Sequence, residues 1–145
     1  MRAVVQRVKK TTLSVDGELI SEIPFGLTVF LGVKSGDMEK DAEYLAKKIA
    51  GLRIFEDENG KMNLSVKDVG GEVLLVSQFT LYGDATKGNR PSFSLAERPE
   101  RAEALYEYAV EKVREFGLTV KKGVFGADMK IEQLNDGPVT ILLES

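Results

Sequence analysis

Apolar residues recur at helical spacing in two segments of the chain, residues 37–52 and 99–117. Each segment has one apolar stripe and a charged opposite face, which is typical of a helix packed against a core on one side. Pro99 lies in the first turn of the second segment and Gly117 at its end, where helices favour these residues. We therefore predict two amphipathic helices, and the charged face of the first is more typical of a solvated surface than of a binding site.

Strand-like patterns, either alternating or continuously apolar, occupy most of the remaining chain. The clear segments are residues 2–8, 11–15, 18–20, 26–33, 73–76, 118–120, 130–134 and 139–143, with weaker ones at 53–55 and 63–66. Asp16-Gly17 favours a hairpin turn. Two helices are too few to cover both faces of about eight strands. We expect a single compact α/β domain spanning residues 1–145, with packed sheets or a barrel-like arrangement, that dimerises through its sheet.

Composition narrows the chemistry that such a domain can perform. The chain has 145 residues, 43% hydrophobic and 30% charged, which is typical of one soluble globular domain. It contains no cysteine and no histidine, which excludes disulfides, thiolate nucleophiles, the usual zinc sites and Ser-His-Asp relays. An enzyme of this composition must use Asp, Glu, Lys or Tyr side chains, backbone groups or its own substrate for acid-base work.

The sequence gives little support for a metal site, a membrane segment or nucleic-acid binding through overall charge. The acidic run 56–58 precedes Asn59-Gly60, which favours a hairpin loop over a metal site. No apolar run is long enough to cross a bilayer and no signal-peptide layout is present, so we expect a cytoplasmic protein without a membrane partner. The net charge of -3 means that an RNA partner needs a local basic patch. We expect no metal, no cofactor and no DNA partner.

An unusual turn precedes the last strand, in the segment Asn135-Asp136-Gly137-Pro138. Asn-Asp-Gly is turn chemistry, and X-Pro is the peptide bond in which the cis form costs least. Gly137 has no Cβ to shield its carbonyl group. The segment is therefore either a plain tight turn into the last strand or a turn whose backbone is exposed for recognition.

Polar residues appear where the strand 73–76 should end, in Ser77-Gln78-Phe79-Thr80. Strand alternation puts Ser77 and Phe79 on one face, and Gln78 and Thr80 on the other. Hydroxyl and amide groups at a strand end, beside a glycine-bearing loop, are typical of a pocket rim. Hydroxyls at strand ends also bond to nearby backbone without any function. The segment by itself leaves both interpretations open.

Residues 84–98 form a long loop, and loops of about this length are frequently functional. Lys87 and Arg90 have the charge to contact phosphates, and Phe93 can pack or stack on a base. Lysine and arginine are also common on any exposed loop, so the loop alone does not establish RNA binding.

Five motifs, in this order and with this separation, resemble those of the D-aminoacyl-tRNA deacylases, also called D-tyrosyl-tRNA deacylases. The motifs are residues 1–8, 77–81, 87–93, 125–129 and 135–140, so the resemblance covers the whole chain. Asn89 is a departure, because the family commonly has a second arginine there. This difference would weaken a phosphate contact without affecting the chemistry.

The resemblance implies a homodimeric editing enzyme that hydrolyses the ester joining a D-amino acid, or glycine mischarged on tRNA-Ala, to the terminal ribose of tRNA. It implies that the Gly137-Pro138 bond is cis and enters the pocket of the other subunit. There its carbonyls hold the substrate amino group and crowd the space of an L side chain. Lys87 and Arg90 are the expected tRNA contacts. The implied pocket wall consists of Ser77, Gln78, Phe79 and Thr80, with Phe125 and Met129 nearby.

Catalysis of this kind needs no histidine, because an aminoacyl ester is already activated. Backbone N–H groups around Phe79 and Thr80 are candidate oxyanion donors, and the ribose 2′-OH can orient water or act in place of a base. Thr80 as a covalent nucleophile is the competing hypothesis. We further hypothesise that Arg7 braces the Gly137-Pro138 turn across the dimer.

Two other classes of function stay open. A non-catalytic RNA-binding module would use a basic patch and keep the Gly-Pro turn as structure only. The residues of that patch are Lys87, Arg90, Lys121, Lys122 and Lys130. A general small-ester hydrolase would use Thr80 as its nucleophile and would turn over simple esters without RNA.

Overall fold

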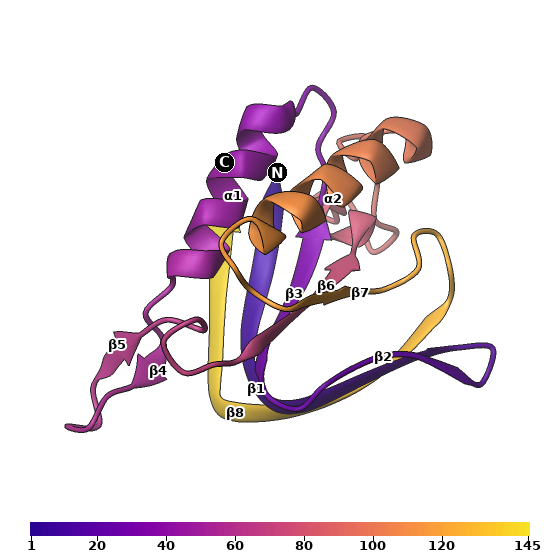
Figure 1. Cartoon of the computed structure of the whole chain (residues 1–145). Coiled ribbons are helices and arrows are strands. Elements are labelled where there is room, and N and C mark those ends of the chain that lie inside the picture. The colour runs from indigo at the N-terminus through magenta and orange to yellow at the C-terminus, as the bar shows by residue number, and fades with distance from the viewer.

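The computed structural model describes residues 1–145, and it packs two α-helices against a strongly curved sheet (Figure 1). The strands are β1 (Arg2–Val15), β2 (Glu18–Ile23), β3 (Gly26–Gly32), β4 (Phe55–Glu56), β5 (Met62–Leu64), β6 (Glu72–Ser77), β7 (Val120–Lys122) and β8 (Met129–Glu144). The helices are α1 (Glu39–Gly51) and α2 (Pro99–Arg114), and a short 3-10 helix, η1, spans Phe79–Tyr82. Neither α-helix has the length and apolar character needed to span a membrane.

β1 is the centre of the main sheet, because it pairs antiparallel with three other strands. Along one edge, its first half pairs with β3 and its second half with β2; β8 follows the whole of the other edge. β6 and β7 extend the sheet beyond β3 in parallel register. The Ser21 hydroxyl in β2 donates to the Lys122 carbonyl in β7 at 2.7 Å. This contact joins the two ends of the sheet, which thus curls into a nearly closed barrel.

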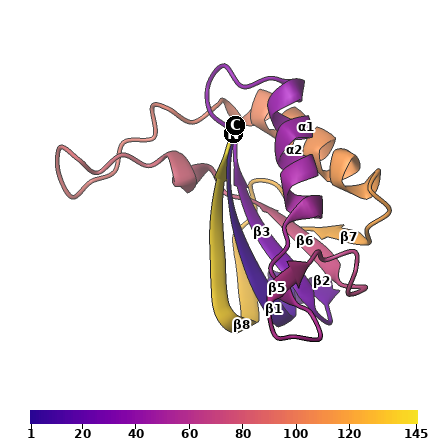
Figure 2. The same cartoon turned by 90° about the vertical axis from the view of Figure 1, so that its left-hand side faces the viewer.

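The helices cover only one face of the sheet, as their number led us to expect (Figure 2). Their apolar stripes pack on the inner side chains of β1, β3 and β6 and form the main core. On the opposite face, the curled part of the sheet encloses a smaller cluster of Val8, Leu13, Ile23, Leu74 and Val76. Beside that cluster, the outer face of β1, β3 and β8 is open to solvent.

Apolar side chains stand in register on this open face. Val4 pairs with Phe30 on one side and with Leu142 on the other, and directly paired residues point to the same face of a sheet. Val4 and Phe30 are half-buried, and Leu142 is 60% exposed. The loop between η1 and α2 also extends away from the helices on this side (Figure 2).

The α/β class and both helices are confirmed, whereas several strand boundaries are wrong. Segments 2–8 and 11–15 form the single strand β1, because Lys9 and Lys10 keep extended backbone while their side chains lie in solvent. Segments 130–134 and 139–143 likewise belong to one strand, β8, which the turn at Gly137 interrupts without ending. After Ser77 the chain winds into η1, so the predicted side-chain alternation over residues 77–81 does not occur.

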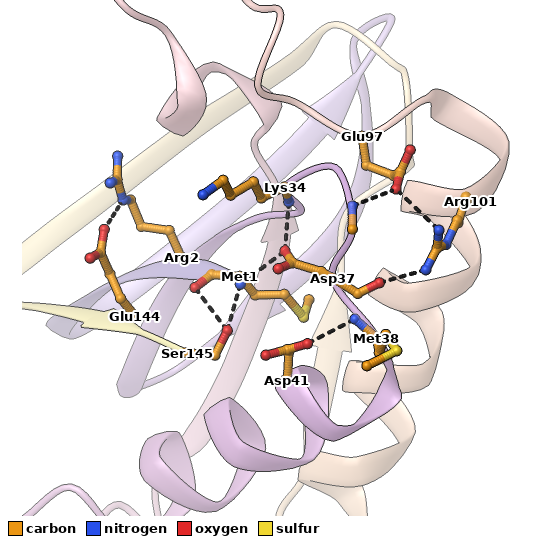
Figure 3. Close-up of polar contacts among 11 residues, drawn as sticks. Met1, Arg2, Lys34, Asp37, Met38, Asp41, Glu97, Arg101, Glu144 and Ser145 are labelled. Carbon is orange, nitrogen blue, oxygen red and sulfur yellow. Dashed lines mark hydrogen bonds and ion pairs between the residues drawn. The ribbon is translucent and has the colours of Figure 1, made fainter.

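The amino-terminal end of β1 is tied down by a buried ion pair (Figure 3). Met1 is 2% exposed, and its α-ammonium lies 2.9 Å from Oδ2 of Asp37 and also donates to the Ser145 hydroxyl. The same Asp37 oxygen accepts from the Lys34 N–H at 2.6 Å, and Arg101 in α2 donates to the Asp37 carbonyl at 2.7 Å. Asp37 therefore ties the chain before β1 to the β3–α1 loop through its carboxylate and to α2 through its main-chain carbonyl, while Met1 also contacts Ser145 just after β8.

Candidate active site

A cavity of about 560 Å³ opens where β3 and β6 end and α2 begins. These two strands are parallel, so their carboxyl ends meet at one edge of the sheet, where open α/β sheets bind ligands. The wall has 17 residues, of which 12 are hydrophobic, so the cavity suits a largely apolar group. Ser77, Gln78 and Phe79 line it together with Phe125 and Met129. The structure thus brings together five predicted site residues from two distant segments.

Thr80 is the predicted pocket residue that does not line the cavity. It lies in η1 with an exposed side chain, and Nε2 of Gln78 donates to its hydroxyl. Its carbonyl accepts from the Gly83 N–H at 2.9 Å, which closes the turn of η1. The contact to the Thr80 hydroxyl comes from an amide, which cannot serve as a general base.

Aromatic rings form the rim and the interior wall of the cavity. Phe79 and Phe93 pack edge to face at the rim, with ring centroids 5.1 Å apart. On the interior wall Tyr106 lies beside Phe125, with 6.1 Å between centroids, and its hydroxyl donates to the Leu75 carbonyl at 2.9 Å. Burial raises the pKa of Tyr106 above its ordinary value, so the phenol stays neutral and does not act as a base near pH 7.

Glu97 is the one charged side chain in the cavity wall. Its carboxylate accepts from the N–H groups of Arg98 at 2.9 Å and Gly36 at 3.3 Å, and Arg101 lies 3.6 Å away. The Arg98 N–H holds the pKa of Glu97 below its usual range, so the side chain is ionised near pH 7. No three acidic side chains gather at metal-binding distance. Sequence reasoning missed Glu97, which belongs to no motif, and Tyr106, which is part of the apolar stripe of α2.

Lys87 and Arg90 lie in the loop that extends from the body of the protein on the side opposite the helices (Figure 2). The loop folds back on itself, with two backbone hydrogen bonds of 2.8 Å between Asp84 and Ser92. Both basic residues are exposed and neither lines the cavity. Phe93, in contrast, returns to the cavity rim.

The Gly137–Pro138 turn lies in the middle of β8, away from the cavity wall of its own chain. Its peptide bond is cis, and both residues are exposed. Arg7 in β1 is buried beneath the turn: its Nε donates to the Asp136 carbonyl at 3.1 Å and its Nη1 to the Ile54 carbonyl at 2.6 Å. Arg7 thus braces the turn of its own chain, and a contact of Arg7 across the dimer stays a prediction.

Known proteins match this chain over all or nearly all of its length. A family model described as D-Tyr-tRNA(Tyr) deacylase matches residues 4–144. A protein named D-aminoacyl-tRNA deacylase from Koribacter versatilis (strain Ellin345) is 63% identical over 145 residues, which is 100% of this chain and 97% of that protein. A protein of the same name from Bacillus cereus (strain B4264) is 58% identical, over 100% of this chain and 99% of the other.

Two solved structures have the same fold. The c-Myc DNA unwinding element binding protein superposes with a TM-score of 0.93 at 48% identity, covering 100% of this chain and 99% of that one. A structure described as a probable eukaryotic D-amino acid tRNA deacylase superposes with a TM-score of 0.84 at 17% identity, covering 99% and 98%. At that identity the second likeness supports the fold alone.

Proposed function

The chain belongs to the D-Tyr-tRNA(Tyr) deacylase family, and from this premise we propose that it hydrolyses the ester bond of D-aminoacyl-tRNA, with residues 1–145 as a single deacylase domain. The products are the free D-amino acid and tRNA. The observation that carries the proposal is the meeting of Ser77, Gln78 and Phe79 with Phe125 and Met129 in one largely apolar cavity. Because aminoacyl-tRNA is made and used in the cytoplasm, that is the proposed location.

A second copy of the chain completes the site in this proposal. The Gly137–Pro138 turn is exposed and lies outside its own cavity wall, so its carbonyls are free to enter the cavity of a partner. The open sheet face with Val4, Phe30 and Leu142 provides apolar surface for such a homodimer. In this proposal the two subunits exchange turns symmetrically, as an isologous dimer does.

Chiral selection follows from steric exclusion by the turn. The carbonyl of Gly137 accepts a hydrogen bond from the substrate α-amino group, and the rigid Pro138 keeps that carbonyl in place. An L side chain then collides with the turn, whereas a D side chain leaves Cα in the other direction. Glycine has no side chain to exclude, so glycyl-tRNA, including glycine mischarged on tRNA-Ala, passes the same filter.

Hydrolysis proceeds by attack of water on the ester carbonyl. The water oxygen bonds to the carbonyl carbon, the bond to the ribose oxygen breaks, and that oxygen takes a proton. The N–H groups of Phe79 and Thr80 are the first two of η1, and the first N–H groups of a helix have no acceptor within it. These two N–H groups stabilise the oxyanion. The adjacent ribose 2′-OH orients the water. Thr80 stabilises the turn of η1 by accepting a hydrogen bond from Gln78, and it is not the nucleophile.

Side-by-side deacylation of D-Tyr-tRNA and L-Tyr-tRNA tests the activity. We expect rapid loss of the D ester alone. If neither ester is lost faster than in buffer while tRNA still binds, the chain is an RNA-binding module and the proposal is wrong. If simple esters turn over without RNA, the general hydrolase is the better account.

Mixing two defective proteins tests the shared site. A Phe79→Ala protein has a damaged cavity and a Gly137→Ala protein a damaged turn, so each alone is expected to be nearly inactive on D-Tyr-tRNA. After subunit exchange, half of the dimers are mixed and each mixed dimer has one intact site, so about a quarter of the sites regain activity. If the mixture is only as active as the two variants assayed separately and added together, the site is not shared between subunits.

A further inference from the structure

The turn at Gly137 interrupts the pairing of β8 with β1, and both arms of β8 must be held for the turn to keep its position. β1 pairs regularly with the arm after the turn up to Gln6 and with the arm before the turn from Lys10 onward. Between Gln6 and Lys10 the register shifts twice. Over this stretch the ladder of backbone hydrogen bonds is irregular, so side-chain contacts fix the position of the turn.

Gln6 is the residue of β1 whose side chain contacts both arms. Its Nε2 donates to the hydroxyl of Thr140, after the turn, at 3.3 Å. Its Oε1 accepts from Nε2 of Gln133, before the turn, at 2.6 Å. The same Gln133 nitrogen donates to Oδ1 of Asn135, the first residue of the turn segment, at 2.8 Å. These contacts form one polar bridge from Asn135 to Thr140 across the base of the turn.

Arg7 supports the turn from the other side of β1. Successive side chains of a strand point to opposite faces, and Gln6 lies with Thr140 on the outer face while Arg7 is buried. Arg7 binds the Asp136 carbonyl within the turn, whereas the Gln6–Gln133 bridge spans its two ends. The outer bridge therefore constrains the separation of the arms, whereas the side-chain hydrogen bonds of Arg7 go to Asp136 and Ile54.

We infer that Gln6 and Gln133 are positioning residues for chiral selection: their bridge sets how far the Gly137–Pro138 turn projects, and thus how closely it approaches the substrate Cα. The inference rests on the proposed function. A turn that relaxes by a fraction of an ångström gives room to an L side chain while leaving the cavity and its oxyanion donors unchanged. Loss of the bridge therefore raises hydrolysis of the L ester relative to that of the D ester.

The test measures kcat/KM on D-Tyr-tRNA and L-Tyr-tRNA for Gln6→Met, Gln133→Met and the double variant. Methionine keeps the length of glutamine and removes its hydrogen bonds. Thr12→Val is the matched control, because Thr12 is half-buried on β1, pairs with Glu132 of β8 and has no side-chain hydrogen bond. Thermal unfolding midpoints are recorded for all four variants.

We expect the D-over-L ratio to fall about tenfold in each single variant, which corresponds to about 1.4 kcal/mol. The double variant should lose less than the product of the two single losses, because both residues share one bridge. The control should keep the wild-type ratio. Single variants with an unchanged ratio, whether or not their unfolding midpoints fall, overturn the inference and leave the bridge a stabilising role. A wild type without D preference refutes the proposed function, and this inference with it.

Discussion

Replacement of Gly137 by alanine is the sharpest test of the turn, because the structure predicts two separate penalties. Gly137 has φ +132°, a backbone conformation that L residues rarely adopt. An added Cβ would also lie 2.8 Å from the backbone nitrogen of Val139, 2.8 Å from its Cγ2 and 3.4 Å from Nη2 of Arg7. The backbone contact cannot be relieved by a rotamer change, so the turn itself must move.

The conformational penalty is about 1–3 kcal/mol and the overpacking penalty is of similar size, so we expect the free energy of unfolding to fall by about 3 kcal/mol. The displaced turn should also lower the D-over-L ratio of kcat/KM by at least about tenfold. Urea unfolding followed by circular dichroism measures the first quantity, and deacylation of the two Tyr-tRNA esters measures the second.

Gly17→Ala is the matched control for this prediction. Gly17 also has a positive φ, +81°, but an added Cβ there would have no neighbour within 4 Å. The free energy of unfolding of Gly17→Ala should fall only by the conformational penalty, about 1–2 kcal/mol, and the variant should keep the wild-type D-over-L ratio. A Gly137→Ala protein that is as stable as this control, or one that keeps the wild-type D-over-L ratio of kcat/KM, would refute the steric reasoning.

The remaining predictions concern the other groups described above. Thr80→Ala should keep deacylation within about threefold of wild type, since the hydroxyl only accepts a hydrogen bond; a fall of about a thousandfold would make it the nucleophile. Asp37→Asn should lower the free energy of unfolding in urea by about 3 kcal/mol, because it leaves the buried α-ammonium without its counter-charge; an unchanged midpoint would contradict this. Burial raises the pKa of Tyr82 to about 12, whereas an unfolded tyrosine ionises near pH 10. The stability that depends on neutral Tyr82 is therefore complete below pH 10 and is lost as the pH rises toward 12, and Tyr82→Phe should unfold with a weaker pH dependence in that window. Alanine at both Lys87 and Arg90 should make the salt dependence of kcat/KM shallower by a slope of about 1–2, and an unchanged slope would remove them from the tRNA contact.

The helices were predictable from sequence because their signals are local, whereas several strand boundaries were not. Pro99 and the apolar stripe behind it define α2 without reference to any other segment. The pair Lys9-Lys10 resembled a break between two strands, yet β1 continues because two neighbouring strands hold the backbone on either side. Phe79 alternates with its neighbours as a strand residue would, but the chain turns into η1 there.

The candidate site was predictable only where unusual residue types stand together. Ser77, Gln78 and the Gly137 turn are recognisable as local departures from a strand pattern. Contacts between residues far apart in sequence carry no such signal. The contact of Arg7 with the turn, to the Asp136 carbonyl 129 positions away, was expected only through the family resemblance, and Tyr106 reaches the cavity from a stripe that sequence alone assigns to the core.

A turn that recognises its ligand through carbonyl oxygens has a genetic consequence. Every amino acid carries a main-chain carbonyl, so no missense change deletes the recognising atom, and an alanine scan reports only on its supports, such as Gln6 and Arg7. Drift in the surrounding sequence can alter the affinity of the site while the recognising group persists. The direct probe is therefore chemical: replacing the oxygen of the Gly137 carbonyl by sulfur gives a thioamide, which is a weaker hydrogen-bond acceptor and leaves the Pro138 ring intact.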